Sequence, residues 1–404
     1  MMTIKGRRDL LNQVSPRYIA ARGKEREQIL DEFVASTGYH RKYAIHLLRH
    51  PPGTQSRQKR RRPRKYSAKA EIALVDVWKV ANAIAAKRLV PGLRDLVEAL
   101  EQHGELRLDP DTRAQLLRMS IATADRLLRP YRHGPRGRGL ATTKPGSLLK
   151  KSIPVRTCAD WDDARPGFVE VDLVAHCGTS THGVYLNTLN LTGIATAWTE
   201  CVAVLNKGQR QVSKAIAVAR QHFPFPLLGI DSDNGAEFIN RTLSRYCEQE
   251  QITFTRSREY HKNDQAHVEQ KNWTVVRHFA GYNRYEGNTA LRALEKLYQP
   301  LRLYVNFFKP VQKLVAKERI GSKLRKKYDR ARTPYQRALE RDDVYEESKR
   351  HLPALYATLN PAALLRQIES LQADVWHLRE QQLDRVGDEP EPGGFLLEAT
   401  KTPE

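Results

Sequence analysis

The sequence has few cysteines, and their spacing excludes the metal modules that cysteines most often build. Only four occur in 404 residues, Cys158, Cys177, Cys201 and Cys247, and none belongs to a CxxC pair. Zinc ribbons and fingers need such pairs, and small disulfide-rich domains need a denser set. We therefore expect no structural zinc, no disulfide framework and a reducing compartment.

Long apolar runs are also missing. The opening segment MMTIKGRRDLLNQ lacks the apolar core of a signal peptide, and no later run approaches the about 20 residues of a membrane span. The sequence therefore predicts a soluble, intracellular protein with no membrane partner.

Acidic residues are far fewer than basic ones. Asp and Glu number 46 against 68 Lys and Arg, which gives a formal net charge of +22. Such an excess is typical of proteins that bind a polyanion, because phosphate contacts release condensed counterions. A basic but unspecialised protein is the alternative. The clustering of the charge along the chain favours nucleic acid, and the length predicts two to four domains.

The first 50 residues have the pattern of a helix-turn-helix DNA-binding domain. Residues 24–35 and 39–50 carry apolar residues at helical spacing, and the turn signal Ser-Thr-Gly separates them. The second helix would enter a major groove, whereas an ordinary pair of packed helices is the alternative reading. Its expected DNA contacts are Arg41 and Lys42.

Two basic linkers and a second helical unit follow. Residues 51–66 include a run with seven basic residues in nine, and we expect DNA contacts there from Arg60, Arg61, Arg62 and Arg64. Residues 67–131 predict a second helical, helix-turn-helix-like DNA-binding domain with helices over 70–88, 93–103, 111–119 and 121–128. Residues 132–159 are rich in Gly, Pro and basic residues, as in an extended linker.

Residues 160–285 predict an α/β domain with a mixed five-stranded sheet. The expected strands cover 168–175, 183–191, 195–205, 226–231 and 252–257, and the expected helices 209–222, 237–250 and 265–282. Three strands followed by helix, strand, helix, strand and helix is the order of the ribonuclease-H-like fold.

Acidic residues stand at three meaningful places in this domain. Asp172 lies within the first apolar strand, Asp233 just after the fourth, and Glu269 in the first turn of the last helix, with 35 residues between the latter two. Convergent carboxylates on rigid elements are what Mg²⁺ needs for phosphodiester chemistry. Glu170 and Asp231 have the same facing as Asp172 and Asp233 and remain competitors.

The segments VEVDLV, DSDNGAEF and KNDQAHVEQKN resemble the three catalytic motifs of the DDE transposase and retroviral-type integrase core. The family's second and third acids are commonly separated by 35 residues. The whole layout resembles transposases of bacterial insertion sequences, which implies a cytoplasmic protein associated with the nucleoid.

The resemblance implies two Mg²⁺ or Mn²⁺ ions held by Asp172, Asp233 and Glu269, with Asp172 between both ions. It implies double-stranded DNA as partner, as element ends and as target, and a homo-oligomer that brings two DNA ends together. Expected DNA contacts beside the site are Asn263, Gln265 and Lys271, although capped or solvated positions are an equal alternative for these three. The chain departs from the family in lacking the zinc module of retroviral integrases and a proline in the loop before Glu269.

The end of the chain has three parts. Residues 286–350 are basic and aromatic and are expected to bind DNA, and 351–386 to form a terminal helix, amphipathic over 361–385 and packed within the chain. Residues 387–404 are acidic and rich in Gly and Pro, as in a disordered tail.

The resulting hypothesis is a transposase that binds its terminal inverted repeats, cleaves a strand and transfers the 3′-OH into target DNA. One alternative is a catalytically inactive, domesticated transposase that acts as a DNA-binding regulator. Another is a structure-selective nuclease on the same fold.

Overall fold

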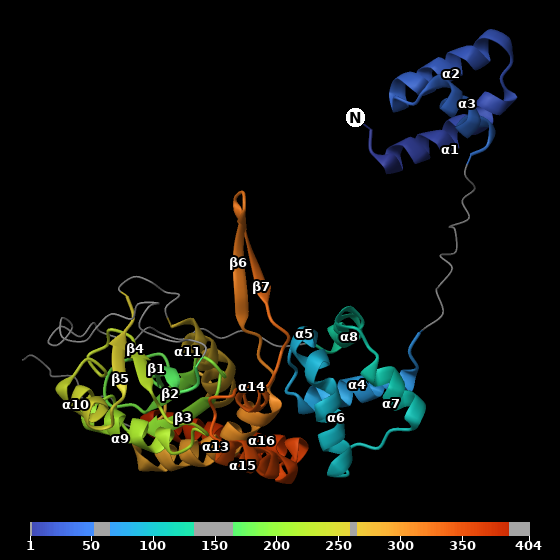
Figure 1. Cartoon of the computed structure of the whole chain (residues 1–404). Coiled ribbons are helices and arrows are strands. Elements are labelled where there is room, and N and C mark those ends of the chain that lie inside the picture. The colour runs from blue at the N-terminus through green and yellow to red at the C-terminus, as the bar shows by residue number, and fades with distance from the viewer. Residues whose placement is uncertain (1, 52–64, 133–164, 259–264, 388–404) are drawn as a thin grey trace, which may run out of the picture. The chain divides into compact units, whose positions relative to one another are not determined.

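A computed structural model describes residues 2–51, 65–132, 165–258 and 265–387 (Figure 1). The chain divides into two compact units, residues 1–65 (unit 1) and 66–404 (unit 2). Most of both basic linkers and the acidic tail lie outside the described residues. Five of the expected DNA contacts also lie outside them, namely Arg60, Arg61, Arg62, Arg64 and Asn263.

Unit 1 contains three helices, α1 (Ile4–Ala20), α2 (Gly23–Thr37) and α3 (Arg41–Arg49). The turn expected between the second and third is present, because Gly38 adopts φ 69°, a left-handed conformation that suits glycine. The first helix was not expected, since only Leu11, Ser15 and Tyr18 are buried along its 17 residues. All three helices contribute to one small apolar core.

Unit 2 is built around a mixed five-stranded sheet with the strand order β3-β2-β1-β4-β5. The first three strands pair antiparallel, while β1 pairs parallel with β4 and β4 with β5. This arrangement confirms the predicted sheet. Its strands are β1 (Phe168–Ala175), β2 (Asn187–Gly193), β3 (Thr199–Val204), β4 (Gly229–Ser232) and β5 (Thr253–Arg256).

Helices follow the strands in the predicted order. The helix after β5 runs without interruption from residue 266 to 280, and a six-residue π-helical segment lies in its middle, a feature often found near functional sites. The elements concerned are α9 (Gln209–Arg220), α10 (Arg241–Gln249), α11 (Ala266–Lys271), η3 (Asn272–Arg277) and α12 (His278–Ala280).

A group of helices precedes the sheet in unit 2. The single helix predicted over 70–88 is wrong: α4 ends at Val80, and Asn82 and Ala83 both have positive φ before α5 begins. The other predicted helices of this region are present. The elements are α4 (Ala68–Val80), α5 (Ala86–Leu89), η1 (Val90–Gly92), α6 (Leu93–Gln102), α7 (Pro110–Leu117), α8 (Ile121–Leu128) and η2 (Arg129–Tyr131).

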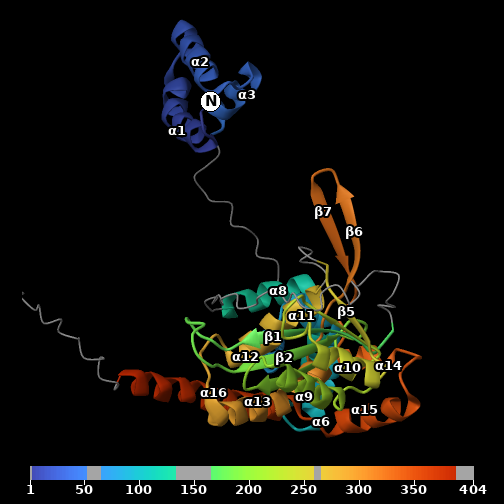
Figure 2. The ribbon, with the colours of Figure 1, turned by 90° about the vertical axis from the view of Figure 1, so that its left-hand side faces the viewer.

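The region after the sheet is more structured than its basic composition suggested. One helix over 351–386 was expected, but the backbone becomes extended at Leu359 and Pro361 starts a new helix, so two helices form. Figure 2 shows α16 beside α13, and this packing within the chain agrees with the prediction. The elements are α13 (Gly287–Phe308), β6 (Leu314–Ile320), β7 (Lys323–Tyr328), α14 (Pro334–Leu339), α15 (Glu346–Thr358) and α16 (Pro361–Gly387).

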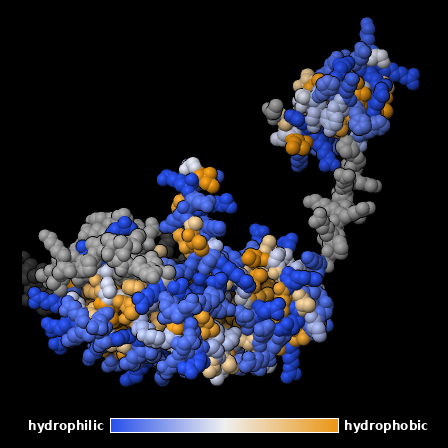
Figure 3. Space-filling view, in the orientation of Figure 1, coloured by the Kyte–Doolittle hydropathy of each residue, from blue (hydrophilic) through white to orange (hydrophobic). Residues whose placement is uncertain are grey.

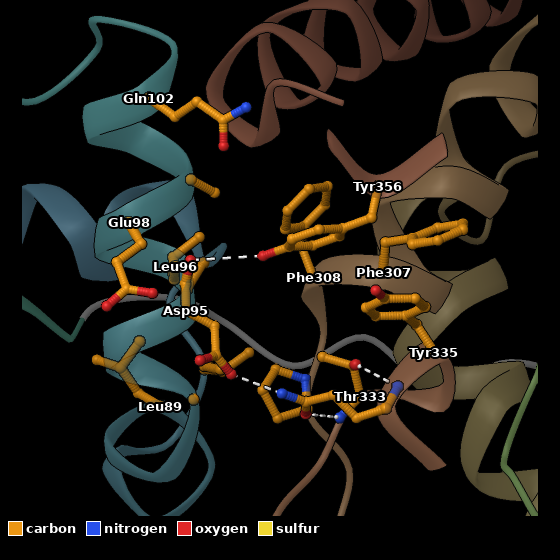
Figure 4. A pocket seen from close by; sticks show the side chains of 16 residues that line it. Leu89, Asp95, Leu96, Glu98, Gln102, Phe307, Phe308, Thr333, Tyr335 and Tyr356 are labelled. Carbon is orange, nitrogen blue, oxygen red and sulfur yellow. Dashed lines mark hydrogen bonds between the residues drawn. The ribbon is translucent and has the colours of Figure 1, made fainter. Parts of the chain in front are cut away.

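A cavity of about 220 Å³ lies where α6 faces α14 and α15 (Figure 4). The rings of Tyr335 and Tyr356 stack beside it with their centres 5.0 Å apart. Gln336 donates a hydrogen bond of 2.6 Å to the carboxylate of Asp95, and the Tyr356 hydroxyl donates to the Asp95 carbonyl. These bonds fix the early helices of unit 2 to its C-terminal part. Over the described residues, no helix has the length and apolar character needed to cross a membrane.

Candidate active site

Asp172 lies in the middle of β1, with its carboxylate held from two sides. One oxygen, Oδ2, accepts a hydrogen bond of 2.6 Å from Nδ2 of Asn272, the first residue of η3. The other accepts from the backbone N–H of Leu173. Burial, together with the nearby negative charge of Asp233, raises the pKa of Asp172 to about 7.

Asp233 follows β4 and lies level with Asp172. The parallel register pairs Val171 with Ser232, so Asp172, still within β1, and Asp233, directly after β4, occupy neighbouring positions. The Asp233 carboxylate accepts a hydrogen bond of 2.9 Å from the Gly235 N–H, which closes a tight turn at the Asn-Gly pair. Burial raises the pKa of Asp233 to about 6, because the charged form loses water.

Glu237 is a third acid of this cluster that the sequence did not single out. Its side chain is buried, and its negative charge raises the pKa of both Asp172 and Asp233. A Cβ on Gly235 would lie 2.8 Å from the Glu237 carboxyl carbon, so only glycine allows this carboxylate to approach the turn. The only sequence signal was its place in the segment DSDNGAEF.

Glu269 lies on α11 with an exposed side chain, three residues before Asn272. Residues three apart on a helix share a face, and Asn272 contacts Asp172. Glu269 therefore lies at the edge of the helix face that meets β1, open to solvent.

The two competing acids have other partners. Glu170 is buried, and its Oε2 accepts hydrogen bonds of 2.9 Å from the backbone N–H groups of His267 and Val268, which caps the start of α11. Asp231 is buried too and accepts a hydrogen bond of 2.7 Å from the hydroxyl of Thr255 on β5. Both acids stabilise the scaffold around the cluster.

The donor set fits a hard divalent cation. Two carboxylates with raised pKa values lie side by side, and a cation between them would relieve their repulsion. Within the described residues, however, no three His, Cys, Asp or Glu side chains gather closely enough to enclose a metal ion.

Comparison with known proteins gives one relative in the curated set. No family model matches the chain. The chain is 44% identical over 322 residues to the uncharacterized protein y4rM of Sinorhizobium fredii (strain NBRC 101917 / NGR234). This match covers 80% of the chain and 92% of that protein. The chain belongs to the y4rM family.

Among solved structures, the y4rM-family chain is similar to two integrase domains. The catalytic core domain of BIV integrase shares 19% identity over 29% of this chain and 70% of its own, with a TM-score of 0.24. The HTLV-2 integrase catalytic core domain in complex with magnesium shares 13% over 36% of this chain and 90% of its own, with a TM-score of 0.28.

The expected DNA contacts of this y4rM-family chain lie in different environments. Lys42 is exposed, and Arg41 is exposed but forms an ion pair with Asp31. Gln265 and Lys271 are buried, and Gln265 donates to the carbonyl of Asp231. Burial takes these last two side chains away from solvent.

Proposed function

We propose that this chain is a DDE-type transposase of the kind found in bacterial insertion sequences. It binds the terminal inverted repeats of its element, cleaves a DNA strand with water, and joins the freed 3′-OH to target DNA. The observation that carries the proposal is the pair of half-buried carboxylates of Asp172, within β1, and Asp233, directly after the adjacent parallel strand β4, beside the helix of Glu269.

The proposed chemistry assigns a role to each acid. Asp172, Asp233 and Glu269 would hold two Mg²⁺ or Mn²⁺ ions, whose chemistry when bound would be to activate the attacking oxygen and stabilise the leaving one. Asn272 and the Gly235 N–H orient the two aspartates before substrate arrives, so less reorganisation is needed during the reaction. Exposed Glu269 completes the site from the helix.

The proposed partner is double-stranded DNA, bound by a homo-oligomer that holds two ends. Unit 1 would present Lys42, Arg41 and the start of α3 to a major groove. The arginines at 60, 61, 62 and 64 would contact the phosphate backbone. A cytoplasmic, nucleoid-associated location follows from this proposal.

Strand cleavage tests the proposal. A labelled duplex from the DNA that flanks the gene, which should carry inverted repeats, is incubated with protein and Mg²⁺. We expect Asp172→Asn and Asp233→Asn to reduce cleavage at least a thousandfold while duplex binding persists. Wild type and Asp233→Asn with equal activity would refute the enzymatic function.

Glu170→Gln is the matched control, because the amide oxygen still accepts from the start of α11. Its cleavage should stay within about tenfold of wild type. Thermal unfolding gives a second readout that needs no DNA: Mg²⁺ should raise the midpoint of wild type and of Glu170→Gln, but not that of Asp172→Asn. If Mg²⁺ raised the unfolding midpoint of Asp172→Asn but not that of Glu170→Gln, Glu170 rather than Asp172 would be the acid that binds the metal.

A further inference from the structure

The β6–β7 hairpin stands clear of the rest of unit 2 in both ribbon views (Figures 1 and 2). Every residue from 314 to 328 is exposed except Ala316, which is half-buried. The hairpin therefore adds little to the core, and its role must be sought in what it contacts outside the chain.

The hairpin carries six basic residues and one acidic residue, Glu318. In the described part of the chain none of the six forms an ion pair, although many other surface arginines and lysines do. The cross-strand register places basic residues on both faces of the ribbon. Lys317 pairs with Lys326 on one face, and Glu318 pairs with Arg325 on the other. The six are Lys317, Arg319, Lys323, Arg325, Lys326 and Lys327.

The pairing of Lys317 with Lys326 is unfavourable in the isolated protein. Like charges directly opposite each other in a sheet repel, and this repulsion weakens the hairpin. A polyanion that lies along the strands would attract both lysines and offset this repulsion. The register thus points to a partner with closely spaced negative charges.

The hairpin also exposes apolar side chains, two of them near its tip. Ile320 directly precedes the two-residue turn and Leu324 is the second residue after it; they lie on opposite faces of the ribbon and are 60% and 54% exposed. In Figure 3 the hairpin is mostly hydrophilic, with a few hydrophobic side chains along it and near its end. A purely electrostatic contact would not need these two side chains, which are suited to an apolar contact.

The base of the hairpin is firmly held. Asp329, directly after β7, accepts a hydrogen bond of 2.7 Å from the Lys313 backbone N–H and forms an ion pair of 2.7 Å with Arg337. Arg337 is buried and also donates to the Val311 carbonyl. These contacts fix the direction in which the arm leaves unit 2.

We infer that the β6–β7 hairpin is an arm that enters a groove of duplex DNA. The basic strands contact phosphates, and Ile320 and Leu324 make the apolar contact with base edges at the tip. A two-stranded β-ribbon fits the major groove, where thymine methyl groups offer an apolar surface. This inference rests on the proposed function, in which duplex DNA is the partner.

The test measures duplex affinity of the full-length chain at several salt concentrations, in an Asp233→Asn background so that no cleavage intervenes. Lys317→Gln with Lys326→Gln should reduce the slope of log affinity against log salt by about 0.9 per lost phosphate contact. Lys214→Gln with Lys296→Gln, on exposed positions of α9 and α13, is the control and should leave the slope unchanged.

The tip is tested separately with Ile320→Ser and Leu324→Ser. Because the contact is apolar, affinity should fall about tenfold while the salt slope stays the same. Hairpin variants with wild-type affinity and slope would overturn the inference and leave the proposed function intact. Tip variants that change only the oligomeric state, measured by light scattering, would assign the tip to a second copy of this chain. If the parent chain binds no duplex DNA, the proposed function itself fails.

Discussion

Lys309 is a buried lysine at the end of α13. Its ammonium nitrogen lies 5.4 Å from the centre of the Phe279 ring and 5.8 Å from that of Tyr304. Burial lowers its pKa to about 7, and the positive charges of Arg88 and Lys271 act in the same direction. The two rings offset only part of the lost hydration, so the residue destabilises the fold at neutral pH.

We predict that Lys309→Met stabilises unit 2 most strongly at low pH. The pKa of Lys309 is lower in the folded chain than in the unfolded chain. Its destabilising effect is therefore fully present below pH 7, where Lys309 is protonated in both states. It decreases as pH rises from about 7 to the unfolded value near 10.5. Each pKa unit corresponds to about 1.4 kcal/mol, so the gain at pH 7 should be a few kcal/mol.

Urea unfolding followed by tryptophan fluorescence measures this effect in the full chain, because all five tryptophans come after residue 65. The difference between Lys309→Met and wild type should shrink between pH 7 and 10. Lys79→Met is the control, since Lys79 is exposed and should show no such trend. A difference that grows with pH would contradict the assignment.

The residues of the site differ in how far the sequence alone could predict them. Asp172 and Asp233 could be predicted because strand position and motif both mark them. Lys271 was expected at the DNA surface, yet it is buried, and the charge of Arg88 from α5 reaches it. Residues far apart in the sequence supply that cover, so the pattern of one helix cannot reveal it.

At the scale of elements, the break between α4 and α5 depends on two residues in a strained conformation. Asn82 has φ 54° and Ala83 φ 52°, and an alanine there costs about 1 kcal/mol relative to glycine. The Ala83 side chain is exposed, so it gains no packing in return. The Trp78 ring donates to the Ile84 carbonyl and holds the chain in this turn.

We predict that Ala83→Gly leaves unit 2 equally stable or stabilises it by up to about 1 kcal/mol, measured by urea unfolding. Glycine relieves the strain but gains freedom in the unfolded chain, so the two effects oppose each other. Ala354→Gly, at an exposed position inside α15, is the matched control and should destabilise by about 1 kcal/mol. Equal losses in both variants would refute the strain at residue 83.

Elements with one strong local pattern could be predicted, and those decided by tertiary contacts could not. The helix of Leu93–Gln102 has a clear apolar face and was expected almost at its true ends. The break after Val80 has no glycine or proline to mark it, and only Asn82 hints at a turn. The strands of the hairpin, LVAKERI and KLRKKY, do not alternate apolar and polar residues, so no strand signal marked them.

At the scale of the whole molecule, positive charge is concentrated at the start of the chain. Residues 1–65 contain 17 Lys and Arg against 5 Asp and Glu, a net +12 out of +22. Unit 1 has a core of its own, so this charge belongs to a separately folded part and its linker. The division into units could be predicted from composition, because the arginine run interrupts every apolar pattern.

Removal of residues 1–65 tests how the two units share the DNA. Unit 2 has its own core, so the tryptophan-monitored unfolding midpoint of the chain 66–404 should equal that of the full chain. Its slope of log affinity against log salt should fall by roughly half, because the removed part carries more than half of the net charge.

The arm formed by β6 and β7 should account for much of the slope that remains, and Lys317→Gln with Lys326→Gln should lower it again in the shortened chain. An unchanged slope after removal of unit 1 would mean that unit 2 alone holds the phosphates.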